Sequence, residues 1–431
     1  MVGGAIRDSL LNLPTNNSDI DLVIDMKNGG ICFATFFAIR NGCFVKDSNP
    51  VIFHSYGTAK FELYNNEEFK GIKIECVQTR KEQYHSDSRN PSTFFGTIEE
   101  DAKRRDFTIN SLYYNISKGS LHDFNGGVRD LTNCNIKTTA NPDIIFFEDP
   151  LRMMRAIRFS TKLGWDIEKE TWLGIVKNAH RINIVSQERI SDELSKILLS
   201  DKPSIGIRKL YYSGLLDKIM PDIYESTLAY DSKDVSIFEH TMKVVDAVQP
   251  ILENRLAALF HDVGRIIANK IKDDSLDKFS ADIAVYDLKI MKYPNHIVKS
   301  VETAIKYHRA FKNYKEEKLP RDGKIRQFIN LTKGDLTTTI DLMHANNVHS
   351  STNKKKTQAL NIVKRIEELI NTENANEVKL PINGNDIIKE FKLKASPLIG
   401  TLLNLVKDAY FENPNITKKE ALETIKKHLA T

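Results

Sequence analysis

The amino-acid sequence predicts an α+β fold, with a mixed sheet near the amino terminus followed by an all-helical remainder. Two patterns support this prediction. Short β-like runs separated by turn residues are concentrated in roughly the first 135 residues, whereas from Asp149 onward apolar residues recur at helical spacing. A length of 431 residues fits about three domains of ordinary size.

The composition excludes several classes of protein. With 41% hydrophobic and 28% charged residues, the chain is neither disordered nor fibrous. No apolar run approaches the ~20 residues that a membrane-spanning helix needs. The opening MVGGAIRDSL lacks the apolar region of a secretory signal, and the four cysteines form no C-x-x-C pair. We therefore expect a cytoplasmic protein without a disulfide framework or structural zinc.

Positive charge is concentrated in one part of the chain. The formal net charge is +5, and residues 102–209 alone hold 18 Lys+Arg against 13 Asp+Glu. Such a region can follow a phosphate backbone, and it also fits a solvated helical surface. Charge alone does not decide between the two interpretations.

The secondary-structure signals follow one another in a clear order. Strands are expected at Asp19–Asp25, around Val51–Phe53 and at Gly71–Thr79, and a loop-rich stretch at Leu121–Ile136. Helices are expected where Leu151, Met154, Ile157 and Leu163 share a face, and again at Ile190, Leu194, Ile197 and Leu198. The polar segment Asn371–Val378 reads as a linker to a small tail.

Two acidic residues at the start of the first strand are candidate metal ligands. Asp19 and Asp21 are two residues apart, so both carboxylates project from one face. Mg²⁺ accepts carboxylate and phosphate oxygens, and a pair of such ions can activate a hydroxyl group and stabilise leaving pyrophosphate. Upstream, Gly3 and Gly4 precede a helix-like stretch, which suits a close approach of phosphate to backbone N–H groups. A D-x-D pair alone also fits a solvated strand start, but the preceding G-G-x-x-R-D favours a metal site.

Five motifs together resemble a known family. GGAIRD with DIDLVID, then RRDFTINSLYYN, DFNGGVRDL, EDPLRMMRAIRF and ERISDELSKIL are similar to class II tRNA nucleotidyltransferases (CCA-adding enzymes) and bacterial poly(A) polymerases. The resemblance covers nearly the whole chain. It implies a polymerase-β-like nucleotidyltransferase head (1–135), a helical neck that binds nucleotide and RNA (136–200), an HD-like helical body (201–370) and a tRNA-binding helical tail (371–431).

The resemblance also implies roles for individual residues in the head and neck. Asp19 and Asp21 would bind the catalytic Mg²⁺ ions, and Glu75 stands where related enzymes place a third carboxylate, unless it is an exposed strand residue. Arg105 and Asp106 would contact the ribose, whose 2′-OH an Asp can bind, although Arg105 could equally contact a phosphate or form a structural ion pair. The remaining expected nucleotide ligands are Gly3, Gly4, Arg7, Asn110, Asp149, Arg152, Arg155 and Arg158. Arg155 and Arg158 would reach the triphosphate or lie on a solvated helix face.

Asp149 and Arg152 form the expected base-reading pair. Three residues apart, they would share one face of a helix. An ionised Asp only accepts hydrogen bonds and an Arg only donates them. Cytosine and adenine match this pair, because each presents an exocyclic amine beside a ring nitrogen, whereas uracil and guanine would leave buried groups unpaired. The resemblance assigns this role to E-D-x-x-R, with Glu148 in support; the alternative is an ordinary ion pair.

Further segments distinguish members of the family. Tyr56-Gly57-Thr58 resembles the tRNA nucleotidyltransferase form rather than the more basic form in poly(A) polymerases. The polar stretch between Arg80 and Arg104 looks like the flexible loop of complete CCA-adding enzymes. Arg189 would brace the neck helices or form a plain salt bridge, and the loop with Asp123 and Gly126 would move between CTP and ATP addition. Lys389, Lys392 and Lys394 in the tail are expected phosphate contacts or solvated helix residues.

A second group of residues resembles the metal site of HD-type phosphohydrolases. His240, His261, Asp262 and His308 fit this pattern, since His and Asp ligands suit a metal-bound water nucleophile. Two departures stand out: DKFSADIAVYD contains no histidine, and Asn346 stands where the family has an aspartate. Such a site should hold metal less tightly. We expect a structural HD-like domain with weak or absent hydrolase activity.

The resulting functional prediction is template-independent addition of C, C and A to the 3′ end of tRNA. The tRNA 3′-OH would attack the α-phosphate of CTP or ATP, with Mg²⁺ as cofactor, the tRNA 3′ end and acceptor arm as partner, and pyrophosphate as leaving group. Alternatives that remain open are an A-adding or CC-adding enzyme, a poly(A) polymerase, an HD-type metal phosphohydrolase and a non-catalytic RNA-binding protein. The family usually has a helix and the start of a strand before VGG, so either translation begins upstream or the first strand is short.

Overall fold

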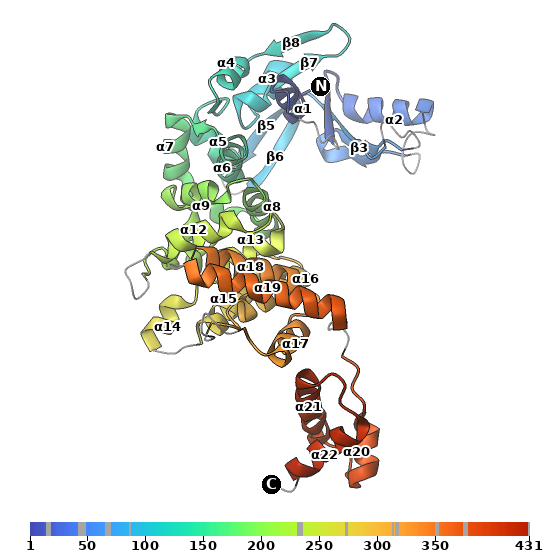
Figure 1. Ribbon diagram of the computed structural model, residues 1–431. Coiled ribbons are helices and arrows are strands. Elements are labelled where there is room, and N and C mark those ends of the chain that lie inside the picture. Colours follow the sequence, from blue (N-terminus) through green and yellow to red (C-terminus); the bar gives the residue numbers. More distant parts are fainter. Residues whose placement is uncertain are drawn as a thin grey trace. The chain divides into compact units, whose positions relative to one another are not determined.

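The computed structural model describes residues 1–13, 19–41, 49–64, 70–85, 88–230, 236–271, 275–312, 314, 319–349, 353–373 and 378–429 (Figure 1). For Asp19, Tyr56 and Glu373, and for residues 82–85, 88–91 and 353–356, the description is limited to the backbone. The chain divides into two compact units, Met1–Pro221 and Asp222–Thr431. The four domains expected from the sequence are finer than this division and stay a prediction.

A four-stranded mixed sheet organises the first unit. The strands β1 (Asp19–Ile24), β2 (Val51–Phe53), β3 (Thr58–Glu62) and β4 (Lys73–Gln78) lie in the order β1-β4-β3-β2. β1 and β4 are parallel, and the other neighbours are antiparallel. The register pairs Asp21 with Glu75 and Glu75 with Lys60, so these three side chains project from one face of the sheet. The strands expected at these places are therefore confirmed.

The opposite face of the sheet packs against α2 (Gly29–Asn41), which lies along it in Figure 1. Alternation along the strands places Ala59, Phe61 and Cys76 toward α2, where they form a core with Ala34 and Ala38. The helix approaches the sheet closely, since a Cβ on Gly30 would lie 2.4 Å from the carbonyl oxygen of Cys76. One face of the sheet is thus apolar and covered by α2, and the acidic residues occupy the other.

Short elements surround this sheet. They are α1 (Gly4–Leu10), η3 (His54–Tyr56), β5 (Arg80–His85), β6 (Ser88–Phe95), α3 (Ile98–Lys103), η4 (Thr108–Asn110), β7 (Leu112–Asn115), β8 (Ser120–Asp123) and α4 (Gly127–Thr132). Val2 bridges Asp21 on β1 and Tyr113 on β7, which joins the two parts of the head.

Two sequence predictions about irregular segments are corrected here. The polar stretch after Arg80 does not form a loop: β5 and β6 pair as an antiparallel ribbon, which α3 follows. The stretch Leu121–Ile136 holds regular structure as well, because it includes the end of β8, all of α4 and β9 (Asn135–Ile136). Both segments are rich in polar residues, and backbone pairing rather than an apolar face defines their strands.

Helices follow the head, and the first of them begins before Asp149, from which the sequence predicts helical spacing. β9 pairs with β10 (Asp166–Ile167), and the helices are α5 (Pro142–Glu148), α6 (Leu151–Leu163), α7 (Lys169–Asn178), η5 (Ala179–Ile184), α8 (Gln187–Leu198), α9 (Pro203–Tyr212), α10 (Leu215–Ile219) and α11 (Pro221–Ser226). The apolar positions expected on α6 and α8 form their buried faces, among them Met154, Ile157, Ile190 and Leu194. α6 packs against both α8 and α9.

Apart from a β-bridge between Tyr230 and Ser236, the regular secondary structure of the second unit's described residues is helical. Its helices are α12 (Ile237–Ala247), α13 (Leu252–Phe260), α14 (Arg265–Ile271), α15 (Leu276–Ile290), α16 (Asn295–Tyr307), α17 (Asp322–Leu331), α18 (Leu336–Val348), α19 (Asn353–Glu373), α20 (Gly384–Phe391), α21 (Pro397–Glu412) and α22 (Lys418–Leu429). The last three helices share a separate apolar core around Ile387, Leu402, Val406 and Ile425. Because α19 continues to Glu373, the linker expected from Asn371 begins later. Within the described residues, no helix is both long and apolar enough to cross a membrane.

Candidate active site in the head and neck

The acidic face of the sheet carries the expected metal ligands. Asp21 and Glu75 occupy paired positions on β1 and β4, and the Asp19 backbone begins β1. The Lys60 ammonium group lies 2.8 Å from the Glu75 carboxylate. When no metal ion is bound, the Lys60 ammonium group therefore balances the negative charge of Glu75.

Gly3 brings the start of α1 against this acidic face. Its φ of 81° lies in the left-handed region that glycine tolerates, and it is the N-cap of α1. A Cβ at Gly3 would lie 3.4 Å from Asp21 Oδ2 and 3.9 Å from Arg105 Nη1. A Cβ here would make ordinary van der Waals contacts with both groups, so the positive φ is what favours glycine.

Asp101 and Tyr113 hold the Arg105 side chain. Arg105 Nε donates to the Tyr113 hydroxyl group at 2.9 Å, and Arg105 Nη2 donates to Asp101 Oδ2 at 3.2 Å. The Tyr113 hydroxyl group in turn donates to Asp101 Oδ2 at 2.5 Å. Burial raises the pKa of Tyr113, so its hydroxyl group keeps its proton. Sequence reasoning missed Asp101 and Tyr113; the signal was their position on either side of RRD.

A second hydrogen-bonded network joins four of the expected nucleotide ligands to one another. Arg7 Nη1 donates to Asn110 Oδ1 at 2.7 Å, Asn110 donates to Asp106 Oδ1 at 3.2 Å, and Arg155 Nη2 lies 2.7 Å from Asp106 Oδ2. Burial raises the pKa of Asp106, but Arg155 and the hydrogen bonds outweigh it and hold the pKa at about 2. Asp106 is therefore ionised, and Arg7 is buried rather than directed at the acidic face.

Glu193 and Phe159 organise the arginines of α6, and sequence reasoning identified neither. The buried Glu193 carboxylate lies 2.6 Å from Arg158 Nε and 3.7 Å from Arg155 Nη1. The guanidinium groups of Arg7, Arg155 and Arg158 lie 4.9, 5.5 and 4.2 Å from the centre of the Phe159 ring. These contacts fix Arg155 and Arg158 before any ligand binds. The available signal was the i, i+4 spacing of Arg189 and Glu193 in ERISDEL.

The predicted helical pairing of Asp149 and Arg152 is wrong. Asp149 has extended backbone angles after α5, and α6 begins at Leu151, so the two residues do not share a helix face. The Asp149 carboxylate lies 2.8 Å from Arg189 Nη2. Arg152 instead lies 3.0 Å from Glu148 and donates to the Arg104 carbonyl oxygen at 2.8 Å. Both residues line the α5–α6 corner, each with a separate partner.

The Asp123 loop is closed by its own backbone. Asp123 accepts hydrogen bonds from the N–H groups of Asn125, Gly127 and Val128, and Gly126 has a φ of 77°. The carboxylate thereby caps α4. The expected motion of this loop between two nucleotides stays a prediction.

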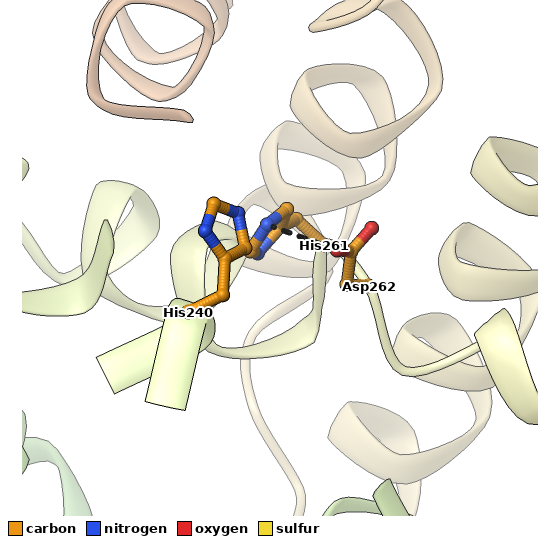
Figure 2. Close-up of side chains that lie close together, drawn as sticks. All are labelled: His240, His261 and Asp262. Atoms are coloured by element: carbon orange, nitrogen blue, oxygen red, sulfur yellow. Dashed lines mark ion pairs between the residues drawn. The ribbon is translucent and has the colours of Figure 1, made fainter. Parts of the chain in front are cut away.

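The four residues of the HD-like motif come together in the second unit. The side chains of His240, His261 and Asp262 each offer a ligand atom within 4.8 Å of the other two, as Figure 2 shows. The ring of His308 lies beside that of His261, with centroids 5.6 Å apart. Nε2 of both His261 and His308 is buried without a hydrogen-bond partner among the described atoms.

Protein groups already engage much of this cluster. His240 Nε2 contacts Asn346 Oδ1 at 2.9 Å, and Arg265 Nη2 donates to both oxygens of Asp262 at 3.0 and 2.9 Å. Burial lowers the pKa of His261 to about 3 and that of His308 to about 4. Both imidazoles are neutral at pH 7, so the 3.7 Å contact between His261 and Asp262 is not an ion pair between two charges.

Comparison with known proteins identifies the two parts of the first unit. Residues 1–137 match the poly A polymerase head domain, and residues 164–226 match the probable RNA and SrmB-binding site of polymerase A. The chain is 28% identical to the CCA-adding enzyme of Ligilactobacillus salivarius, a match that covers 99% of this chain and 92% of that protein. The chain is thus similar to a CCA-adding enzyme over nearly its whole length and to poly(A) polymerases in two segments.

Other known proteins are similar to the chain over different lengths. The mitochondrial CCA tRNA nucleotidyltransferase of Candida glabrata is 25% identical, covering 99% of this chain and 90% of that protein. An A-adding tRNA nucleotidyltransferase of Geobacter sulfurreducens is 32% identical over 58% of this chain and 26% of that protein. Bacillus stearothermophilus CCA-adding enzyme in complex with CTP has the same fold, with a TM-score of 0.66 at 20% identity, covering 100% of this chain and 93% of that one.

Proposed function

We propose that the chain is a tRNA nucleotidyltransferase that adds C, C and A to the tRNA 3′ end from CTP and ATP. One observation carries the proposal: Asp21 and Glu75 share a sheet face beside Gly3 and Arg105. Carboxylates beside a guanidinium group would supply the metal ligands and the phosphate contact that phosphoryl transfer requires. Two CCA-adding relatives with 25% and 28% identity over nearly the whole chain support the same activity.

The acidic face fits Mg²⁺. Its donors are carboxylate oxygens, which Mg²⁺ prefers, and they lie on the sheet face opposite α2. Asp21 and Glu75, with Asp19, would hold the ion. When bound, it would supply charge neutralisation on the phosphates and a lower pKa for the attacking 3′-OH. Lys60 pairs with Glu75 at 2.8 Å and would give way to the metal, because Lys60 is half exposed.

The α5–α6 corner supports selection of cytosine and adenine. The Asp149 carboxylate accepts from the exocyclic amine that both bases carry, and Arg152 donates to their ring nitrogen. Asp149 keeps an accessible edge while paired with Arg189, and Arg152 is held by Glu148 and the Arg104 carbonyl. Since no nucleic-acid template takes part in these contacts, the protein itself would specify the base.

The decisive experiment is the extension of a tRNA that lacks its CCA end, with Mg²⁺ and CTP, ATP or both, read by sequencing the 3′ ends. We expect ordered addition of C, C and A, lost in Asp21→Ala and retained in the surface control Asp192→Ala. Adenosine added only to tRNA ending in CC would indicate an A-adding enzyme, and CC alone a CC-adding one. Long poly(A) tails would indicate a poly(A) polymerase.

We propose that the HD-like cluster is structural, with weak or absent hydrolase activity. Arg265 already neutralises the charge of Asp262, and His240 Nε2 is hydrogen-bonded to Asn346 Oδ1. Titration with Mn²⁺ or Ni²⁺ should show weak binding in the native chain and tighter binding in Arg265→Ala, which frees Asp262. Efficient hydrolysis of bis-p-nitrophenyl phosphate by the native chain would support the phosphohydrolase alternative instead.

We also propose a cytoplasmic location, which the scattered cysteines support. One relative named above is mitochondrial, so the location needs a direct test. Cell fractionation with detection of the chain by antibody distinguishes the two compartments.

A further inference from the structure

Arg105 has one nitrogen directed at the acidic face and two held by the protein. Its Nε and Nη2 donate to Tyr113 and Asp101, while Nη1 lies next to Gly3, on the side where Asp21 Oδ2 also lies. The guanidinium group is planar and rigid, so fixing two of its nitrogens fixes the direction of the third. Arg105 is therefore oriented before a ligand arrives.

Asp101 is the residue on which this arrangement depends. Its buried carboxylate accepts from the Arg80 N–H at 3.3 Å, from Arg104 Nε at 2.9 Å, and from Arg105 and Tyr113 as described above. Burial raises the pKa of Asp101, and Arg104, Arg105 and Tyr113 together lower it below the ordinary value. The carboxylate is thus ionised and saturated with donors, which leaves it no role as a metal ligand.

We propose that Asp101 and Tyr113 are positioning residues that aim Arg105 Nη1 at the phosphates of the bound nucleoside triphosphate. This inference rests on the proposed nucleotidyltransferase function. Arg105 would reach the phosphates rather than the base, because the Cβ position of Gly3 lies near both Nη1 and Asp21 Oδ2, while Asp149 and Arg152 lie at the α5–α6 corner. Arg7, the other expected cation near Gly3, is buried and bonded to Asn110 and Asp8.

The chain offers a matched pair of tyrosines for the test. Tyr113 and Tyr114 are neighbours on β7; Tyr113 is buried with its hydroxyl group bonded to Asp101, and Tyr114 is 40% exposed on the other face. Tyr113→Phe removes only the hydroxyl group and keeps the ring contacts with Phe124 and Arg105. Tyr114→Phe makes the same chemical change outside the hydrogen-bonded group of Asp101, Tyr113 and Arg105.

The experiment measures the binding of CTP and CMP to the full chain by calorimetry, without tRNA. One lost hydrogen bond to a charged group corresponds to about a tenfold change. We expect Tyr113→Phe to weaken CTP binding about tenfold and CMP binding much less, with Tyr114→Phe unchanged. Equal weakening of CTP and CMP, or no change in Tyr113→Phe, would overturn the proposal.

A second variant keeps the test informative if Tyr113→Phe folds poorly. Arg105→Lys preserves the positive charge but not the planar fork that bonds to Asp101 and Tyr113 while presenting a third nitrogen. We expect Arg105→Lys to lose affinity for CTP selectively, as Tyr113→Phe does. If Arg105→Lys bound CTP as tightly as the native chain, the orientation of the guanidinium group would be irrelevant and the proposal would be overturned. The native chain separates the two hypotheses. If it binds CTP more tightly than CMP but does not extend tRNA, the proposed nucleotidyltransferase function is wrong, whereas the positioning role of Asp101 and Tyr113 still stands.

Discussion

Arg189 Nη2 lies 2.8 Å from Asp149 Oδ2, and this contact links α8 to the corner between α5 and α6. Asp149 precedes a proline and has extended backbone angles, and its Oδ1 accepts a hydrogen bond from the Leu151 N–H at 3.2 Å. Arg189 holds the other carboxylate oxygen, so the two contacts together orient the side chain. If Asp149 reads the base, Arg189 determines how accurately it does so.

The first prediction concerns this accuracy. Arg189→Ala should lower kcat/KM for CTP and ATP about tenfold and raise the share of misincorporated uridine, because Asp149 would then be held only by the Leu151 N–H and could rotate away from the base. Sequencing of 3′ ends formed with CTP, ATP and UTP present measures both effects. Arg181→Ala is the matched control, since Arg181 packs on Phe147 in the same neck but does not contact Asp149 in any described bond. Unchanged selectivity in Arg189→Ala would exclude this role.

The second prediction concerns stability. Glu193→Gln should lower the free energy of unfolding by about 3 kcal/mol, because it leaves Arg158 without its buried counter-charge, whereas Arg155 keeps Asp106. Urea denaturation measures the difference. Asp192→Asn, one residue away, should change stability by less than about 0.5 kcal/mol, since Asp192 is exposed and pairs with Lys196. Equal effects of the two substitutions would show that burial of Glu193 is not the cause.

The third prediction concerns the acidic face. Glu75→Gln should reduce kcat by more than about tenfold and raise the Mg²⁺ concentration needed for half-maximal rate. Lys60→Met should lower the Mg²⁺ concentration needed for half-maximal rate, because it removes the ammonium group that competes with Mg²⁺ for Glu75. The measurement is the initial rate of nucleotide addition across a Mg²⁺ titration. A Glu75→Gln variant with native kcat and Mg²⁺ dependence would assign Glu75 to the strand surface alone.

The fourth prediction concerns pH. Burial and the neighbouring Asp222 raise the pKa of Asp287 to about 7. In the unfolded chain an Asp titrates near its ordinary value of 3.8, so between these two values the folded chain binds more protons and its stability falls as pH rises. Asp287→Asn should flatten this slope and stabilise the chain at pH 8 by about 1 kcal/mol or more. Urea denaturation of both chains at pH 5 and pH 8 tests it, and parallel pH profiles would contradict it.

The strands and the acidic face could be predicted because their signal is local. Alternation along DIDLVID and GIKIECV determines which side chains share a face, and the structure confirms both strands. The helical course of α6 and α8 followed equally from spacing. By contrast, the β5–β6 ribbon carries few apolar residues, so its pairing left no periodic pattern to recognise.

The errors at the site arise from tertiary structure, with one exception. Nothing local indicates that Arg7, Asn110, Asp106 and Arg155 bond to one another, since they come from separate elements. The exception is Asp149: a residue before proline disfavours helical angles, so its position outside α6 was readable from the dipeptide. The structure does not test the catalytic and binding roles themselves, which stay predictions.

The register between β1 and β4 has a consequence for how this head can change in evolution or by design. Side chains on a strand alternate, so inserting or deleting one residue within β1 would turn the acids toward α2 and its apolar core. Length changes are therefore tolerable only in connections outside the strands, or in multiples of two residues. A recombination point between related heads should accordingly lie outside β1 and β4.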